Sequence, residues 1–355
     1  MDTQFFHVQK PEAPTSFPGQ AKAGSCCARL ARCQWPSYSS QIDDGDAQFE
    51  NPFQMEDLMV FDDATLHSLL CHQGFGLLVE DLAHSLHGIS EQVIERIART
   101  IFADNSAAFL EELQRVIPPE QVDRARRVVL DRLFWELTYW KTPDLYEELT
   151  EGERLHPGIF EQLAPDISGN VVIDAGAGSG RASLECVRYG AEKVFAVEPS
   201  PGLLRILQQK LGSTHDQIVP LRGRFDAIPL PDRSVDLAIS CSAFTAGPAQ
   251  GGEPGLAELQ RVTRMGGKVV IIWPRAQDYA WLDRHGFNYV TLQVQGEQEM
   301  CVRFRSLQSA LHCARHFYAH NPEVARFIER EHRSDVPFSI LGINPPCDYC
   351  WLVVK

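Results

Sequence analysis

The sequence predicts an α/β fold, a mostly parallel sheet with helices on both faces, preceded by a small all-α domain. From Gly169 onward, short apolar runs alternate with helix-length intervals, which is the pattern of a parallel sheet. From Met55 to about Trp140, apolar residues recur instead at helical spacing. The length of 355 residues leaves room for one domain of about 200 residues and a second, smaller one.

Changes in composition divide the chain into three segments. Residues 1–52 are rich in Pro, Ser, Gly and Gln and are expected to form a flexible leader. Residues 53–140 are predicted to form the helical module, and residues 141–355 the α/β domain with a C-terminal extension. The aromatic segment from Trp135 to Tyr146 is interpreted either as a lid over a ligand site or as an ordinary domain joint.

Bulk composition narrows the class of protein. Hydrophobic residues make up 44% and charged residues 23%, which is ordinary for a globular protein with a buried core. The net charge of -14 argues against a broad nucleic-acid surface, which needs clustered Lys and Arg. No secretion signal or membrane-length apolar stretch is evident, so we expect a cytoplasmic protein whose ten cysteines are free thiols.

The glycine-rich turn after the first predicted strand carries the main functional signal. Val171–Ile173 forms the strand, Asp174 ends it, and a helix is expected from Ala182 to Tyr189. Between them stand three glycines, which allow a tight turn and a close approach of the backbone to a ligand. These glycines are Gly176, Gly178 and Gly180.

The spacing of this turn separates two kinds of cofactor site. A pyrophosphate-binding turn reads G-x-G-x-x-G, whereas this one reads acid-x-G-x-G-x-G. It resembles motif I of class I S-adenosylmethionine-dependent methyltransferases. The resemblance implies a Rossmann-like seven-stranded sheet, a turn that receives the methionine part of the cofactor, and an Asp174 that lies near its ammonium group.

A carboxylate ends the second predicted strand, Lys193–Val197. Glu198, followed by Pro199, is placed to accept hydrogen bonds from both ribose hydroxyls of a nucleoside. The same arrangement serves NAD enzymes, so it supports nucleoside binding without choosing between the two cofactors.

The segment Leu221–Asp236 resembles the part of small-molecule methyltransferases of the ubiquinone-biosynthesis type that holds adenine. This resemblance implies that Asp226 or the Phe225 amide meets the adenine edge. Arg224 departs from the pattern, because many relatives carry the adenine-binding Asp at that position.

The resemblance continues through the fourth strand, Leu237–Ser240, whose Ser240 belongs to the expected cofactor site. A helix from Leu256, a turn at Gly266–Gly267 and a strand Val269–Trp273 follow the same family, with Met265 where proline is usual. Beyond it, we expect three further elements and a last strand; these are Tyr289–Val294, Leu307–Tyr318, Glu323–His332 and Cys350–Val354.

No catalytic residue and no metal site are predicted. Methyl transfer from a sulfonium needs alignment and exclusion of water, and a base only where the acceptor carries a proton. His156 and His285 are candidate bases, although structural roles are favoured, and packing is favoured for Cys241. A zinc site is the disfavoured alternative for the group Cys347, Cys350, His312, Cys313 and His316.

The helical module resembles the C-terminal domain of the flagellar motor switch protein over Phe53–Leu137. The runs Glu56–Asp63, Leu82–Ser90 and Ala107–Leu113 follow that domain's order and spacing. Leu70–Gly74 replaces its charged motor-contacting helix, which argues against a torque role. The resemblance implies a protein partner or self-association through residues 53–140; the alternative is an unrelated helical bundle.

Together these features predict a transferase, an S-adenosylmethionine-dependent methyltransferase acting on a small-molecule acceptor. The alternative is a regulatory protein that binds S-adenosylmethionine without turnover and docks a partner through its helical module. A protein-modifying methyltransferase also stays open, whereas an NAD-dependent oxidoreductase would need a different glycine spacing.

Overall fold

A computed structural model describes residues 51–71, 77–101, 106–212, 216–247, 250–293 and 299–355. All of them belong to one compact unit, Cys33–Lys355. The predicted leader, apart from its last two residues, lies outside the described residues.

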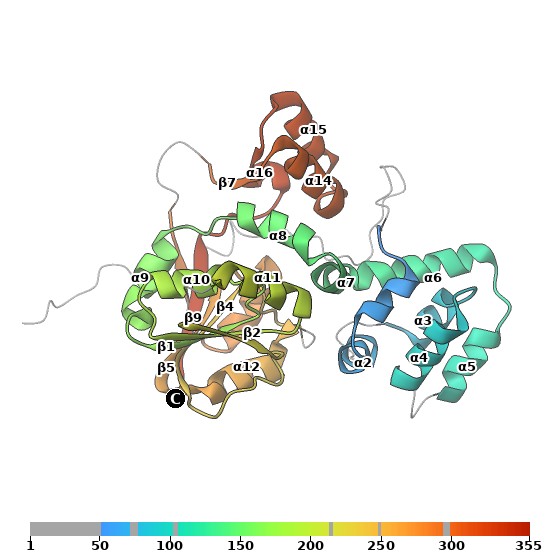
Figure 1. The fold of residues 1–355 in the computed structure, drawn as a ribbon, viewed down its shortest axis with the longest axis horizontal. Helices are drawn as coiled ribbons and strands as arrows, with labels where there is room; N and C mark the ends of the chain where they lie inside the picture. Colours follow the sequence, from blue (N-terminus) through green and yellow to red (C-terminus); the bar gives the residue numbers. More distant parts are fainter. Residues whose placement is uncertain (1–50, 72–76, 102–105, 213–215, 248–249, 294–298) are drawn as a thin grey trace, which may run out of the picture. The chain divides into compact units, whose positions relative to one another are not determined.

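Short helices fill the first part of the described chain, as the apolar spacing predicts (Figure 1). One begins directly after Ser90, and another has Pro119 at its first position, where the missing N–H costs nothing. Leu82, Leu86 and Phe109 are fully buried within this group. The elements are η1 (Met55–Val60), α2 (Asp63–Cys71), α3 (Val79–Ser85), α4 (Glu91–Ile101), α5 (Ser106–Gln114) and α6 (Pro119–Arg132).

Three helices lead from this group to the sheet. The turn between the first two is Thr142–Pro143, where proline again opens the following helix. They are α7 (Phe134–Lys141), α8 (Pro143–Gly152) and α9 (Gly158–Ile167).

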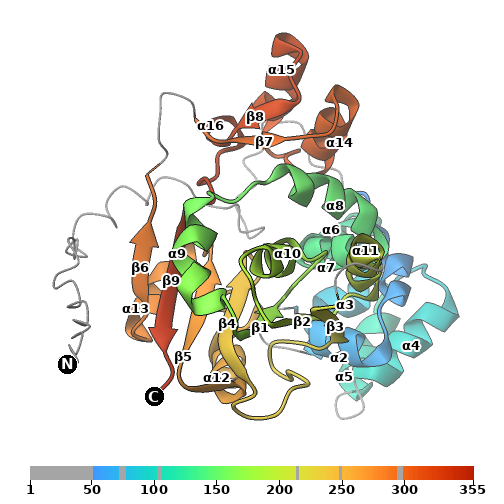
Figure 2. The same cartoon turned by 60° about the vertical axis from the view of Figure 1, so that its left-hand side comes forward.

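A seven-stranded sheet in the order β3-β2-β1-β4-β5-β9-β6 forms the centre of the second part (Figures 1 and 2). The first five strands pair in parallel, and β9 pairs antiparallel with both β5 and β6. The strands are β1 (Val171–Ala175), β2 (Lys193–Glu198), β3 (Ile218–Arg222), β4 (Val235–Cys241), β5 (Thr263–Ile272), β6 (Asn288–Thr291) and β9 (Asp348–Val353). The predicted fold class is confirmed: this is a Rossmann-like methyltransferase fold preceded by helices.

Helices cover both faces of the sheet because its inner strands are apolar on both sides. Val172 and Ile239 pack into one core cluster with helix residues such as Leu207, while Ile173 and Ala238 pack into another with Leu259. The covering helices are α10 (Arg181–Arg188), α11 (Pro201–Leu211), α12 (Gly252–Val262) and α13 (Tyr279–Arg284).

The turn expected at Gly266–Gly267 is wrong in detail. Both glycines lie inside β5, where the register to β4 shifts between Val235 and Leu237. Gly266 has a φ of +78°, and a side chain at Gly267 would lie 2.5 Å from the Asp236 carbonyl oxygen. The glycines therefore form an irregularity within the strand rather than its beginning.

The C-terminal extension contains the expected helices and ends in the expected strand β9. Its further elements include a two-stranded sheet, β7 with β8. They are β7 (Cys301–Arg303), α14 (Leu307–Phe317), α15 (Pro322–Glu331), β8 (Asp335–Pro337) and α16 (Phe338–Leu341), with the short η4 (Ala276–Asp278) before α13. None of the helices among the described residues is long and apolar enough to cross a membrane.

Candidate functional site

A pocket opens at the carboxyl ends of β1, β2 and β4, on either side of the position where the strand order reverses. Ligands of open α/β sheets bind at such a point because neighbouring loops diverge there. The strands and the loops that directly follow them contribute twelve lining residues: Ala175, Gly176, Gly178, Val197, Glu198, Pro199, Gly223, Arg224, Phe225, Asp226, Ser242 and Ala243.

Asp174 lies beneath the glycine turn and is only 1% exposed. Its Oδ2 accepts a hydrogen bond from Ser183 Oγ at 2.7 Å, whereas its Oδ1 is buried without a partner among the described residues. Burial raises the pKa of this carboxyl to about 6, so it is largely ionised at neutral pH. A buried carboxylate with one unsatisfied oxygen suits a cationic donor group.

The three glycines of the turn have distinct roles. A side chain at Gly176 would lie 2.5 Å from Ala243 Cβ, and one at Gly180 would lie 2.3 Å from Leu207 Cδ1. At Gly178 the added carbon would meet no atom within 4 Å in the described structure. The outer glycines are therefore required by packing, while the middle one faces open space in the pocket wall.

Glu198 is held by backbone amides at the end of β2. Its Oε2 accepts from Gly178 N at 3.0 Å and its Oε1 from Ser200 N at 2.9 Å. Burial raises the pKa of Glu198 to about 7, despite these hydrogen bonds. Each oxygen still has room for one more donor, as two vicinal hydroxyls would supply.

Asp226, one of the two candidates for the adenine contact, is hydrogen-bonded to Arg224. The Arg224 guanidinium donates to both oxygens of Asp226, at 3.0 and 2.8 Å. The ring of Phe225 packs edge-on against Phe244 and also lines the pocket. Arg224 thus holds the Asp226 carboxylate in an internal ion pair.

The aromatic segment between the modules, called the lid segment below, lines the pocket. It contributes Glu136, Tyr139 and Trp140 from α7 and Tyr146 from α8. The rings of the two tyrosines meet edge to face with centroids 4.8 Å apart. Ser200 Oγ donates to the Tyr139 carbonyl at 2.7 Å and so ties this lid segment to the end of β2.

Further lining residues come from outside the predicted site. Helix α2 contributes Thr65, Ser68 and Leu69, and the loops after β4 and β5 contribute Gln250 and Arg275. No local motif marks any of them in the sequence. Only the aromatic content of the lid segment carried a signal.

Strand β4 ends in Ser240 and Cys241. Ser240 is fully buried, and its hydroxyl has no partner among the described residues. Arg181 Nη2 lies 3.8 Å from Cys241 Sγ, a cationic partner that the sequence does not reveal. Burial nevertheless raises the pKa of Cys241 to about 11, so the thiol stays protonated and a packing role is supported.

The two candidate histidine bases do not line this pocket. His285 stacks on Trp281 with ring centroids 3.8 Å apart and pairs with Glu253 at 2.8 Å. His156 Nδ1 accepts the Gly158 amide at 3.1 Å. Both contacts are those of structural histidines.

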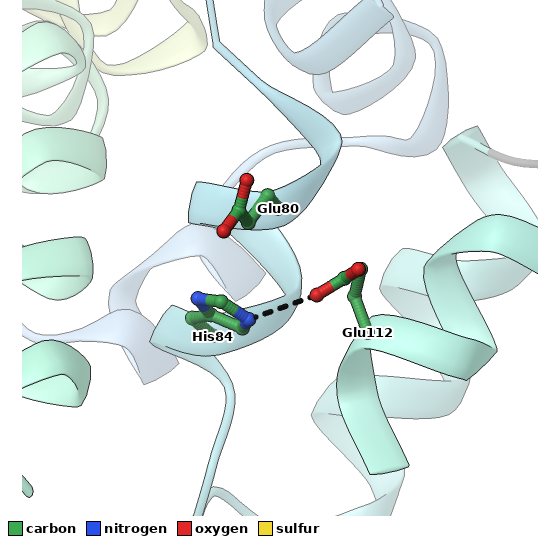
Figure 3. Close-up of side chains that lie close together, drawn as sticks. All are labelled: Glu80, His84 and Glu112. Carbon is green, nitrogen blue, oxygen red and sulfur yellow. Dashed lines mark hydrogen bonds and ion pairs between the residues drawn. The ribbon is translucent and has the colours of Figure 1, made fainter. Parts of the chain in front are cut away.

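Among the described residues, one group of side chains is close enough to share a metal ion: Glu80, His84 and Glu112 (Figure 3). His84 Nε2 lies 3.1 Å from Glu112 Oε2, and Arg115 reaches the same oxygen at 3.2 Å. The contact between His84 and Glu112 joins α3 to α5. The group does not include the cysteines and histidines weighed for zinc, of which Cys313 and Cys350 are buried in α14 and β9.

Six of the nine predicted cofactor residues therefore line one pocket: Gly176, Gly178, Glu198, Pro199, Phe225 and Asp226. The other three, Asp174, Gly180 and Ser240, are not part of its lining; Asp174 and Ser240 are buried at the strand ends beneath it.

Part of the chain is similar in sequence to known methyltransferases. Residues 172–267 match the family of methyltransferase domains. An uncharacterised methyltransferase of Mycobacterium bovis is 34% identical over 132 residues, which cover 37% of this chain and 50% of the relative. The malonyl-[acyl-carrier protein] O-methyltransferase of Serratia marcescens is 34% identical over 34% of this chain and 42% of the relative.

A solved S-adenosylmethionine-dependent methyltransferase from Aquifex aeolicus matches with a TM-score of 0.33 and 21% identity, covering 38% of this chain and 83% of that one. The chain spans only about half the length of the curated relatives named above. Residues 172–267 form a methyltransferase domain, and its cofactor is S-adenosylmethionine.

Proposed function

We propose that the whole protein is an enzyme that transfers a methyl group from S-adenosylmethionine to a small-molecule acceptor. The observation that carries this proposal is the unpartnered Oδ1 of the buried Asp174 beneath the open turn at Gly178. A buried anionic oxygen without a donor is costly, and a ligand ammonium group would satisfy it. An NAD pyrophosphate would instead bring a second negative charge to this position.

The remaining residues fit the other parts of the cofactor. In this proposal the turn Gly176–Gly180 receives the methionine part, with Ser240 supporting it from the end of β4. Glu198 binds the ribose hydroxyls. Pro199 and Phe225 enclose the adenine, and its edge is met by the Phe225 amide, because Arg224 already occupies the Asp226 carboxylate.

The bound cofactor would supply a methyl group already activated by its sulfonium sulfur. The protein then has to orient the acceptor and exclude water. Tyr139, Trp140 and Tyr146 are placed to do this, since they lie over the pocket from α7 and α8. A concave pocket lined by aromatic and polar side chains suits a small acceptor.

In this proposal, residues 141–355 bind the cofactor and the acceptor. Residues 53–140 bind a protein partner or mediate self-association. The likeness of Phe53–Leu137 to the flagellar motor switch domain stays a prediction, as does the cytoplasmic location. No nucleic acid or membrane takes part in the proposed reaction.

Calorimetric titration with S-adenosylhomocysteine, and separately with NADH, tests the proposal. We expect the intact protein to bind S-adenosylhomocysteine and not NADH. Asp174→Ala removes the anionic partner and Gly178→Val fills the open space, so both should abolish binding. Asp144→Ala, whose side chain is 79% exposed, is the matched control and should bind normally.

Thermal unfolding of each variant checks that lost binding is not lost folding. An intact, folded protein that fails to bind S-adenosylhomocysteine would contradict the proposal. Binding of NADH with the same dependence on Asp174 would replace it by an oxidoreductase.

A further inference from the structure

Three polar side chains connect the lid to the loops of the sheet on one wall of the pocket. Gln250 Nε2 donates to Glu136 Oε1 at 3.3 Å, and Arg275 Nη2 donates to Gln250 Oε1 at 3.1 Å. Glu136 comes from α7, Gln250 from the loop after β4, and Arg275 from the segment after β5. All three line the pocket.

Glu136 differs from the other two carboxylates that line the pocket. Both oxygens of Glu198 are held by backbone amides, and Asp226 is paired with both arms of Arg224. Glu136 accepts a single hydrogen bond, from the neutral Gln250, among the described residues. Because the ribose hydroxyls take up the remaining capacity of Glu198 in the proposed function, Glu136 is the pocket carboxylate left to accept a proton.

The charged and titratable groups that face Glu136 come from every element around it. They are Arg224, Arg275, Glu198 and Tyr139. Burial raises the pKa of Glu136, while Gln250 and the two arginines oppose that change. A carboxyl balanced in this way can be ionised before a reaction and can accept a proton during it.

We propose that Glu136 accepts the proton that the acceptor loses, and that the acceptor is accordingly an alcohol, phenol or amine. This inference rests on the proposed function. As the acceptor oxygen or nitrogen bonds to the methyl carbon, the carbon–sulfur bond breaks with its electron pair going to sulfur. The proton of the acceptor passes to Glu136, so charge and atoms balance.

Other groups in the region are less suited to this role. The Cys241 thiol is held beside Arg181 at the end of β4 and does not line the pocket. Tyr139 and Tyr146 have raised pKa values, with burial the leading cause, so they remain protonated. A carboxylic acid acceptor is disfavoured because it is already ionised at neutral pH and would meet the negative Glu136.

The first test needs no acceptor. S-adenosylmethionine carries a sulfonium charge that S-adenosylhomocysteine lacks, and a carboxylate near the transferred methyl favours the charged form. Calorimetry on Glu136→Gln should show S-adenosylhomocysteine binding unchanged and S-adenosylmethionine binding weaker by roughly three- to tenfold. Glu148→Gln is the matched control, because Glu148 lies on the neighbouring α8 but contacts His312 instead of lining the pocket.

The second test measures turnover with methyl-labelled S-adenosylmethionine and a small-molecule extract, with products separated by chemical class. We expect labelled alcohols, phenols or amines, a rate about 100-fold lower for Glu136→Gln, and partial recovery with Glu136→Asp. The rate of the intact protein should rise with pH as Glu136 ionises, and Glu136→Gln should lose that dependence.

The outcomes separate the two proposals. An intact protein that binds neither cofactor form contradicts the proposed function itself. A protein that binds both, but whose Glu136→Gln variant keeps the normal preference between them, overturns the role of Glu136 alone. Labelled methyl esters as the sole products would overturn it as well.

Discussion

Glu198 should destabilise the folded protein at neutral and alkaline pH, so that Glu198→Gln becomes more stable while losing its ligand. The carboxyl is 5% exposed, and its pKa rises from 4.5 to about 7 on folding. The folded state thus binds a proton more tightly than the unfolded chain. Between these two pKa values the free energy of unfolding falls as the pH rises.

The size of this cost follows from the two pKa values. A difference of about 2.5 pH units corresponds to about 3 kcal/mol, which is fully present above pH 7 and absent well below pH 4.5. A neutral amide resembles the protonated carboxyl, so Glu198→Gln should escape the cost. Placing an amide N–H against a backbone N–H lowers the free energy of unfolding by the same amount at every pH. This loss therefore cancels when the stability differences at two pH values are compared.

Urea unfolding followed by tryptophan fluorescence at pH 5 and pH 8 measures the effect. The stability gain of Glu198→Gln over the natural protein should be larger at pH 8 by about 2 kcal/mol. Glu192→Gln, at an exposed side chain, serves as the control and should show no such change. Affinity for S-adenosylhomocysteine should fall about 100-fold, because one charge-assisted acceptor is lost.

A difference between Glu198→Gln and the natural protein that is identical at pH 5 and pH 8 would refute this reasoning. It would mean that Glu198 titrates alike in both states and that water reaches it. The proton-linked cost of the carboxylate would then not exist.

Two further predictions concern packing around the site. Gly180→Ala should lower the free energy of unfolding by about 2 kcal/mol, because the new carbon would lie 2.3 Å from Leu207 Cδ1 at a φ of +92°. Gly178→Ala, with no atom within 4 Å, should cost about half as much in the same urea titration, and equal costs would contradict the steric argument. Arg261→Met should lower the free energy of unfolding by about 2 kcal/mol, because the guanidinium donates to the carbonyls of Ile228 and Leu230. Amide hydrogen exchange in the loop 228–232 should become faster, and unchanged exchange would contradict this prediction.

The sheet was predictable where burial on both faces left its mark on the sequence. β1 and β4 are mostly apolar, and the expected Val171–Ile173 and Leu237–Ser240 lie within them. The position of β9 between β5 and β6 was not predictable, because it pairs residues such as Ile271 and Cys350 that are far apart in sequence. The bulge at Gly266–Gly267 was hidden for the same reason, since it depends on the register with β4.

The site also contains residues that the sequence could predict and residues that it could not. The turn from Asp174 to Gly180 and the acid Glu198 follow directly after strands, so their local order sufficed to bring them together. Glu136 precedes this motif in the chain and Arg275 follows it, and the two are linked through Gln250 only by tertiary packing. A single sequence carries no signal for such a meeting, which is why the acceptor side of the pocket went unpredicted.

The contact of α2 with the pocket bears on the choice between an enzyme and a regulatory protein. Asp62, just before α2, pairs with Arg222 at the end of β3, and the Arg222 guanidinium lies 5.4 Å from the Trp140 ring centroid. Thr65 and Ser68 then line the pocket itself. Deleting residues 1–140 would therefore remove a wall of the pocket along with any docking surface, so loss of binding in such a deletion could not distinguish the two roles. Substitutions on α5, at the exposed Leu110 for example, would disturb a docking surface while leaving the pocket residues in place.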